Sequence, residues 1–446
     1  MMEWKQLLTP QRLGKHEPED IQYDRTCFQK DCDRIVFSSP FRRLKDKTQV
    51  FSLSKNDYIR TRLIHSLEAS CVGRSLGRIV GYEIVNRHQL EKYGFSGSDF
   101  GDIVSAACLA HDIGNPPFGH SGEDAIRQGF ALWYSNINNL GEDFLDKYQK
   151  CDFDLFEGNA QGFRILTKIE VPTRKGGMQL TCPTLAAFTK YPRESFIPVN
   201  FINKYTGCSI KKYGFFQAEK ELFTEVAETV GLIRQNHNAA WWARHPLAFL
   251  VEAADDICYS IIDVEDSYRL GYISFSQVYE LLGEISGINI DEYNANEAEK
   301  VKYLRGKSIN QLTREIADIF LKYEDEILAG TFDQHLLSLS KYTSQLEIIS
   351  ATIRSSVFMH PDVLGMRIAG YEILGRLFAD FVDAALHRSQ KSELITHMLP
   401  EKYRPIPDEN DYYKILRITD YIAGMTDSYA TSLFQKFSGI SLGFGL

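Results

Sequence analysis

Residues 102–123 read DIVSAACLAHDIGNPPFGHSGE, and this stretch decides the fold class. Its first half, Asp102–Asp112, is apolar on most faces, which is typical of a buried helix. One glycine, one asparagine and two prolines at 114–117 end that helix abruptly. Ser121, with an acidic residue three positions later, suits the N-terminus of another helix, which we expect to run to about Trp133. The stretch therefore predicts a buried helix, a sharp break and a new helix.

Helical periodicity continues over nearly the whole chain. We expect further helices at 61–80, 157–170, 183–191, 217–233, 245–270, 276–286, 308–328, 341–358, 361–387 and 410–437. Short extended segments are expected at 51–53, 178–180 and 213–215. The predicted fold class is all-α with a few short strands. We expect an N-terminal arm (1–39), a helical core (40–275) and a C-terminal helical region (276–446) packed on that core.

The composition fits a globular protein with a sizeable core, since 44% of the 446 residues are hydrophobic and 24% are charged. A formal charge of −9 argues against broad nucleic-acid binding, which needs a basic surface. We find no signal-peptide pattern and no uninterrupted apolar run long enough to span a bilayer, so we expect a cytoplasmic protein that does not enter a membrane. The eight cysteines are dispersed, which favours reduced buried thiols over disulfides or a zinc site.

A group of histidines and aspartates is the strongest chemical signal. His65 lies within one predicted helix, and His111 and Asp112 end the next. A buried carboxylate such as Asp112 needs a cation or strong donors. Asp255 and Asp256 lie on a later helix, so one of them could complete a set of two imidazoles and two carboxylates. Such ligands suit Mn²⁺, Mg²⁺ or Fe²⁺, and zinc less exclusively. Alternatively, the histidines are ordinary buried residues and Asp112 caps a turn.

The order of one histidine, a His-Asp pair and a later aspartate resembles the motif of the HD phosphohydrolases. Other segments are similar to the bacterial dGTPase branch of that superfamily, namely RRLKDKTQVF at 42–51, NPPFGH at 115–120, FEGNAQ at 156–161, EAADD at 252–256 and, more weakly, DYIAGMTD at 420–427. The resemblance implies an HD-domain core and hydrolysis of dNTP, dGTP among them, to deoxynucleoside and inorganic triphosphate. Water would attack the α-phosphorus.

The resemblance also implies one divalent ion per subunit, Mn²⁺ or Mg²⁺ before Fe²⁺ or Zn²⁺. Its ligands would be His65, His111, Asp112 and Asp255. In the family the ligand stands four residues before a tyrosine and eight before a second aspartate, which fits Asp255. Asp256 shares the same helix face almost as well, so helix geometry alone does not decide which of the two aspartates is the ligand.

His120 and Glu123 match the family's catalytic pair. A histidine can transfer protons near neutral pH, and a carboxylate three residues later can orient its ring. The alternative is an ordinary loop histidine beside an acid that favours the first turn of a helix. The resemblance further implies phosphate contacts from Arg62, Lys190 and Asn159, and sugar contacts from Gln49, Asp263 and Tyr259, the tyrosine excluding a ribose 2′-hydroxyl. The segment 168–214, which contains Lys190, departs from the family pattern.

Two other functions fit the same residues. One is an HD phosphohydrolase acting on nucleoside monophosphates or cyclic nucleotides, and the other is a non-catalytic nucleotide-binding sensor. The resemblance also implies a homo-oligomer, commonly a hexamer, with allosteric nucleotide or single-stranded DNA contacts near its subunit interfaces.

Overall fold

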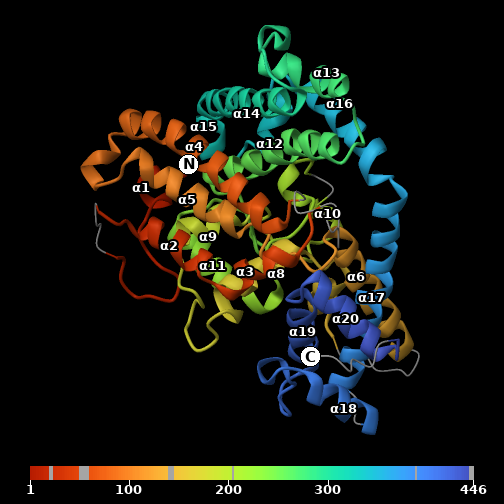
Figure 1. Ribbon diagram of the computed structural model, residues 1–446. Coiled ribbons are helices and arrows are strands. Elements are labelled where there is room, and N and C mark those ends of the chain that lie inside the picture. The colour runs from red at the N-terminus through yellow and green to blue at the C-terminus, as the bar shows by residue number, and fades with distance from the viewer. Residues whose placement is uncertain (20–23, 50–59, 139–144, 203–204, 387–388, 441–446) are drawn as a thin grey trace.

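The protein is described by a computed structural model that covers residues 1–19, 24–49, 60–138, 145–202, 205–386 and 389–440. These residues are predominantly helical (Figure 1), and their strands form one antiparallel pair, Arg234–Asn236 (β1) with Trp241–Trp242 (β2). The predicted all-α class with few short strands is therefore confirmed. The segment predicted as extended at 51–53 lies outside the described residues.

The helices of the described residues follow one another in this chain order. In the first part of the chain they are Trp4–Leu7 (α1), Cys27–Val36 (α2), Ser39–Arg43 (α3), Arg62–His88 (α4), Gly97–Ala110 (α5), His120–Asn138 (α6), Lys147–Asp154 (α7), Gly158–Arg164 (α8), Cys182–Phe188 (α9), Val199–Ile202 (α10) and Lys220–Thr229 (α11). The later ones are Pro246–Arg269 (α12), Phe275–Ser286 (α13), Glu297–Lys322 (α14), Glu324–Leu328 (α15), Thr343–Ile353 (α16), Pro361–Leu386 (α17), Gln390–Met398 (α18), Asp411–Ala423 (α19) and Asp427–Phe437 (α20).

Helices α4 and α5 form the most extensive helix pair in the described structure, and α12 packs against both. α5 is buried along almost its whole length, as its apolar sequence predicts. It begins five residues before the predicted start because Ser96 and Asp99 cap its N-terminus reciprocally. It ends at Ala110, where the turn through 111–119 leads to α6.

The apolar side chains form two large clusters. The first contains residues of α4, α5 and α12 together with α13, α14 and α16. The second joins α6 to α17 and α19, and α17 runs beside α6 along one side of the molecule (Figure 1). The turn between α5 and α6 passes from the first cluster to the second, since Ile113 belongs to one and Phe118 to the other. This turn belongs to the stretch 102–123, from which the fold class was predicted.

Several expected elements differ from the structure. The segments 178–180 and 213–215 form no strands, and Gln179 has a left-handed backbone (φ 52°) that interrupts extension. The helix expected at 308–328 begins instead at Glu297, because Asn296 caps it by accepting a hydrogen bond from the backbone of Glu299. The segment 410–437 is divided into α19 and α20 around Gly424.

Among the described residues, no helix combines the length and apolarity that crossing a membrane would need. Every cysteine is a free thiol.

Candidate metal and catalytic site

Three helices bring two histidines and two aspartates together. His65 comes from α4, His111 and Asp112 follow α5 directly, and Asp255 comes from α12. The Nε2 atoms of His65 and His111 lie 2.9 and 3.4 Å from Oδ1 of Asp255, and Nε2 of His111 lies 3.5 Å from Oδ1 of Asp112. The described side chains of His65, His111 and Asp255 form a group that could hold a metal ion.

Hydrogen bonds orient these side chains for that task. Nδ1 of His111 lies 2.7 Å from the carbonyl oxygen of Cys108, so this nitrogen donates to the backbone and Nε2 keeps its lone pair. A guanidinium nitrogen of Arg62 lies 2.9 Å from Oδ2 of Asp112. Lys190 approaches Oδ2 of Asp255 to 2.6 Å. Asp255 therefore has one oxygen on Lys190 and the other on both histidines. Asp112 has Oδ2 on Arg62, while its Oδ1 accepts a hydrogen bond from Asn115 at 2.5 Å and lies near His111.

The electrostatics keep both carboxylates ionised. Burial raises the pKa of Asp112, but Arg62 and the two histidines lower it to about 2. Burial likewise raises the pKa of Asp255, and the charges of Lys190 and His111 bring it well below its usual value. Ionised carboxylates at neutral pH are what a cation site requires.

Asp256 has a different environment from Asp255. Burial, together with the charges of Glu252 and Asp255, raises the pKa of Asp256 to about 7. Asp255, by contrast, contacts both histidines. The helix spacing did not decide which of the two aspartates lies at the histidines. The three-dimensional packing places Asp255 there.

His120 and Glu123 form a hydrogen-bonded pair at the start of α6. Nδ1 of His120 lies 2.7 Å from Oε2 of Glu123. The His120 side chain is 81% exposed, whereas Glu123 is only 3% exposed. Burial raises the pKa of Glu123, but the hydrogen bond to His120 and the charge of Lys212 lower it to about 2. The carboxylate also accepts a hydrogen bond from the Gly158 backbone at 2.7 Å. An ionised, fixed acceptor thus holds an exposed imidazole.

The loop before His120 is held by the C-terminal region. Phe118 and Gly119 both have positive φ angles, 61° and 58°. A Cβ at Gly119 would lie 2.5 Å from the Arg62 guanidinium, so only glycine fits there. Asp427 accepts hydrogen bonds from the backbone of Phe118 at 3.1 Å and from Thr48 Oγ1 at 2.7 Å. The end of the chain therefore fixes the position of the loop that carries His120.

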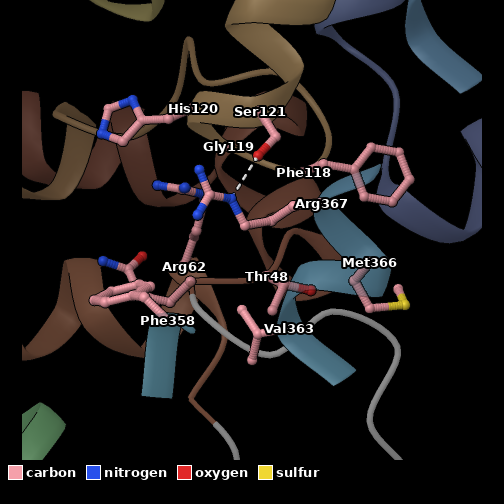
Figure 2. Close-up of a pocket in the computed structure, with 11 residues that line it drawn as sticks. Thr48, Arg62, Phe118, Gly119, His120, Ser121, Phe358, Val363, Met366 and Arg367 are labelled. Atoms are coloured by element: carbon pink, nitrogen blue, oxygen red, sulfur yellow. Dashed lines mark hydrogen bonds between the residues drawn. The ribbon is translucent and has the colours of Figure 1, made fainter. Parts of the chain in front are cut away.

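A cavity of about 210 Å³ lies beside His120. Figure 2 shows the guanidinium groups of Arg62 and Arg367 in its wall, between Ser121 and Phe358. Nε of Arg367 donates to Ser121 Oγ at 3.3 Å, the bond drawn in Figure 2. Arginine has five donors in a fixed fork, so this wall can bind an anionic group.

A second cavity, of about 260 Å³, shares Phe358 and Arg367 with the first. Tyr259 and Asp263 of α12 line it, and the Tyr259 ring stacks on Phe358 at 6.4 Å between centroids. Oδ2 of Asp263 and Oε1 of Gln49, which lines the first cavity, are buried without a hydrogen-bond partner among the described residues. Buried acceptors of this kind fit a ligand that brings hydroxyl groups.

Two residues predicted to contact phosphate line neither of these cavities. Asn159 is half-buried on α8, and its amide donates to Glu157 at 3.4 Å. Lys190 lies at the metal-ligand group, beside Asp255. Arg62 and Gln49 line the first cavity, and Tyr259 and Asp263 line the second.

Sequence reasoning missed the residues that the C-terminal region supplies, Phe358, Arg367 and Asp427. Arg367 is one of two arginines in the predominantly apolar 361–387 segment, so the sequence did not distinguish it from Arg376. Nothing in the sequence predicted that this helix would lie against α6 and face His120.

Comparison with known proteins agrees with this geometry. The chain matches the HD domain family over residues 62–158 and the phosphohydrolase-associated domain family over residues 340–436. The first match contains His65, His111, Asp112, His120 and Glu123, and the second contains Phe358, Arg367 and Asp427.

Relatives match over nearly the full length. The chain is 57% identical over 443 residues to a deoxyguanosinetriphosphate triphosphohydrolase-like protein of Synechocystis, covering 99% of this chain and 100% of the relative. It is 40% identical over 455 residues to a protein of the same description from Pseudomonas aeruginosa, covering 99% of both chains. A deoxyguanosinetriphosphate triphosphohydrolase of Salmonella paratyphi A is 30% identical over 489 residues, covering 93% of this chain and 94% of the relative. The chain therefore belongs to the deoxyguanosinetriphosphate triphosphohydrolase-like family of HD-domain hydrolases.

Proposed function

We propose that the protein hydrolyses dNTP, dGTP among them, to deoxynucleoside and inorganic triphosphate. The observation that carries this proposal is the convergence of His65, His111, Asp112 and Asp255 in one group on the HD core, in a protein whose His120–Glu123 pair borders an arginine-lined cavity. A divalent ion at these four side chains, Mn²⁺ or Mg²⁺ before Fe²⁺ or Zn²⁺, would polarise a phosphoryl oxygen and lower the pKa of a bound water.

Proton transfer is assigned to His120. Because Glu123 is ionised, Nδ1 of His120 donates to it, and Nε2 faces the solvent-accessible side of the pair. Nε2 can therefore take a proton from water or give one to the departing 5′-oxygen of the deoxynucleoside. Glu123 keeps the ring oriented and compensates the charge of its protonated form.

Phosphate and sugar recognition follow from the cavities. Arg62 bridges the metal-ligand group and the first cavity, since it contacts Asp112 and lines that cavity. Arg367 supplies a second guanidinium for the triphosphate. Gln49 and Asp263 offer unpaired acceptors to the 3′-hydroxyl of the sugar. Tyr259, stacked on Phe358, would occupy the space of a ribose 2′-hydroxyl, so selection of deoxyribose is steric.

The direct test is incubation of purified protein with each dNTP and Mn²⁺, with products analysed for triphosphate, pyrophosphate and phosphate. Deoxynucleoside monophosphates and cyclic nucleotides serve as parallel substrates. Release of intact triphosphate supports the proposal. Hydrolysis of monophosphates or cyclic nucleotides without triphosphate release would assign the other phosphohydrolase activity, and metal-loaded protein without any turnover would indicate a sensor.

The choice of Asp255 is tested by a matched pair of variants. Asp255→Asn should lose the ion of the HD site and activity together, because its carboxylate contacts both histidines. Asp256→Asn, one residue away, should retain metal. Loss of metal in the second variant alone would reverse the assignment.

A further inference from the structure

A second group of metal-ligating side chains lies outside the HD site. Among the described residues, ligand atoms of Cys208, Glu252 and His335 all lie within 4.8 Å of one another, the same proximity found for His65, His111 and Asp255. Cys208 begins a short helical turn, Cys208–Ile210, within the segment that departs from the family pattern. Glu252 lies on α12, and His335 precedes the turn Leu336–Leu339. Residues distant in sequence therefore meet at one point.

The geometry of this second group resembles that of the first. Nδ1 of His335 lies 3.1 Å from Oε2 of Glu252, which is close to the separations between the histidines and Asp255 in the HD site. Cys208 and Glu252 are buried, while His335 is partly exposed. An ion could therefore reach the group from solvent past the imidazole.

Asp333 lies against the thiol of Cys208. Its Oδ1 lies 3.3 Å from Sγ of Cys208. The backbone of Ser209 and its hydroxyl donate to the same carboxylate at 3.0 and 2.6 Å. A Cβ at Gly207 would lie 1.7 Å from Asp333, so the turn can close around this carboxylate only with glycine there. The chain on both sides of Cys208 is thus built around Asp333.

The charges of the surroundings suit a bound divalent cation. Both oxygens of Glu252 accept hydrogen bonds from Arg244, at 2.8 and 3.1 Å, and each oxygen has a second lone pair for another partner. With the thiolate, Glu252 and Asp333 carry three negative charges in total, and Arg244 with one divalent ion carries three positive charges. The filled group would be neutral, which a buried site needs.

We propose that Cys208, Glu252 and His335 bind one Zn²⁺ ion, separate from the ion of the HD site, with Asp333 beside the thiol. One sulfur, one imidazole nitrogen and one carboxylate oxygen are ligands that zinc accepts, and water would fill the fourth tetrahedral position. The thiolate favours zinc over Mg²⁺ or Mn²⁺, which prefer oxygen ligands. The ion would fasten the turn at 207–209 and the loop at 333–335 to α12, one helical turn before Asp255. This differs from the sequence expectation that all cysteines are simple buried thiols.

The test uses Co²⁺ as a spectroscopic substitute for zinc in the full chain after metal removal. A cobalt–thiolate bond gives a charge-transfer absorption in the near ultraviolet, which the nitrogen and oxygen ligands of the HD site cannot produce. We expect this band in the wild type and in Asp112→Ala, which lacks a ligand of the HD site. Cys208→Ser should lose the band, and the control Cys71→Ser, which alters an exposed thiol, should keep it.

Metal content gives an independent measurement. Asp112→Ala should retain about one equivalent of Zn²⁺ per chain, and adding His335→Ala should remove it. His335 is partly exposed, so this variant should fold, and circular dichroism checks that it does. Absence of the cobalt–thiolate band in the wild type, or its persistence in Cys208→Ser, would overturn the proposal. These readouts do not depend on nucleotide hydrolysis, so a failure here leaves the proposed function of the HD site untouched.

Discussion

Replacing Glu123 with glutamine tests how the proton-transferring histidine is held. The variant keeps the size of the side chain and an oxygen for the Gly158 backbone, but it removes the charge that faces His120. A hydrogen bond to a charged partner contributes about 1.5–3 kcal/mol. If that contribution is made when His120 carries its proton in the transition state, kcat should fall by roughly 10- to 160-fold.

The assay is the initial rate of triphosphate release from dGTP with Mn²⁺, with KM and metal content measured on the same samples. KM and metal content should change little, because Glu123 is neither a metal ligand nor a lining residue of the cavity and acts through His120. The matched control is Asp124→Asn, the next residue on α6, whose carboxylate is 42% exposed and pairs with Arg127. It should react at nearly the wild-type rate.

A double variant separates positioning from general damage. If Glu123 acts only through His120, then His120→Ala combined with Glu123→Gln should be no slower than His120→Ala alone, which we expect to be at least about a hundredfold slower than wild type. A double variant much slower than that, or Glu123→Gln at the wild-type rate, would refute the reasoning.

The remaining predictions concern the metal ligands, the cavities and pH. Asp112→Ala should lose the ion of the HD site and hydrolysis together, measured as bound Mn²⁺ by elemental analysis and as triphosphate release; a fully active variant removes this ligand from the site. Tyr259→Ala should narrow the preference for dGTP over GTP in kcat/KM, and unchanged discrimination would contradict steric exclusion. Arg367→Gln should raise KM for dGTP about tenfold, the scale of one charged hydrogen bond. A fall in kcat at constant KM would show instead that Arg367 does not contribute to binding of the substrate before reaction. His245 is fully buried, with Nδ1 accepting from the Leu247 backbone and Nε2 near the Leu7 carbonyl, and burial lowers its pKa to about 4. Folding favours the neutral ring, so His245 contributes to the free energy of unfolding above pH 6.5, and this contribution of about 3 kcal/mol is lost as the pH falls toward 4. Urea titrations should therefore show a free energy of unfolding that depends less on acid pH in His245→Asn than in the wild type. The same pH dependence in both proteins would contradict this.

Local patterns were sufficient for most helices because the signals involved are themselves local. The apolar run before His111 and the break at 114–117 gave α5, the turn and α6. Errors arose where a single contact overrides a pattern. α14 begins at the Asn296 cap and already buries Val301 and Leu304 before the expected start at 308. The turn at Gly424 divided a helix that periodicity alone continues.

The candidate site was predictable in its residue types and less so in its arrangement. The structure brings His65 and His111 to the metal-ligand aspartates and His120 to Glu123. Asn159 donates to Glu157 and lines neither cavity. Spacing along the chain does not encode which partner a side chain contacts.

The sequence by itself determined an all-α protein with an ordered set of histidines and aspartates, because helix periodicity and helix breaks act between neighbouring residues. Only the tertiary structure decided that Asp255 rather than Asp256 meets the histidines, and that Lys190 pairs with it. The same holds for Arg367 beside Ser121 and for Cys208 beside Asp333. The physical reason is that such contacts depend on which faces of separate helices and loops pack together, and packing depends on the whole chain.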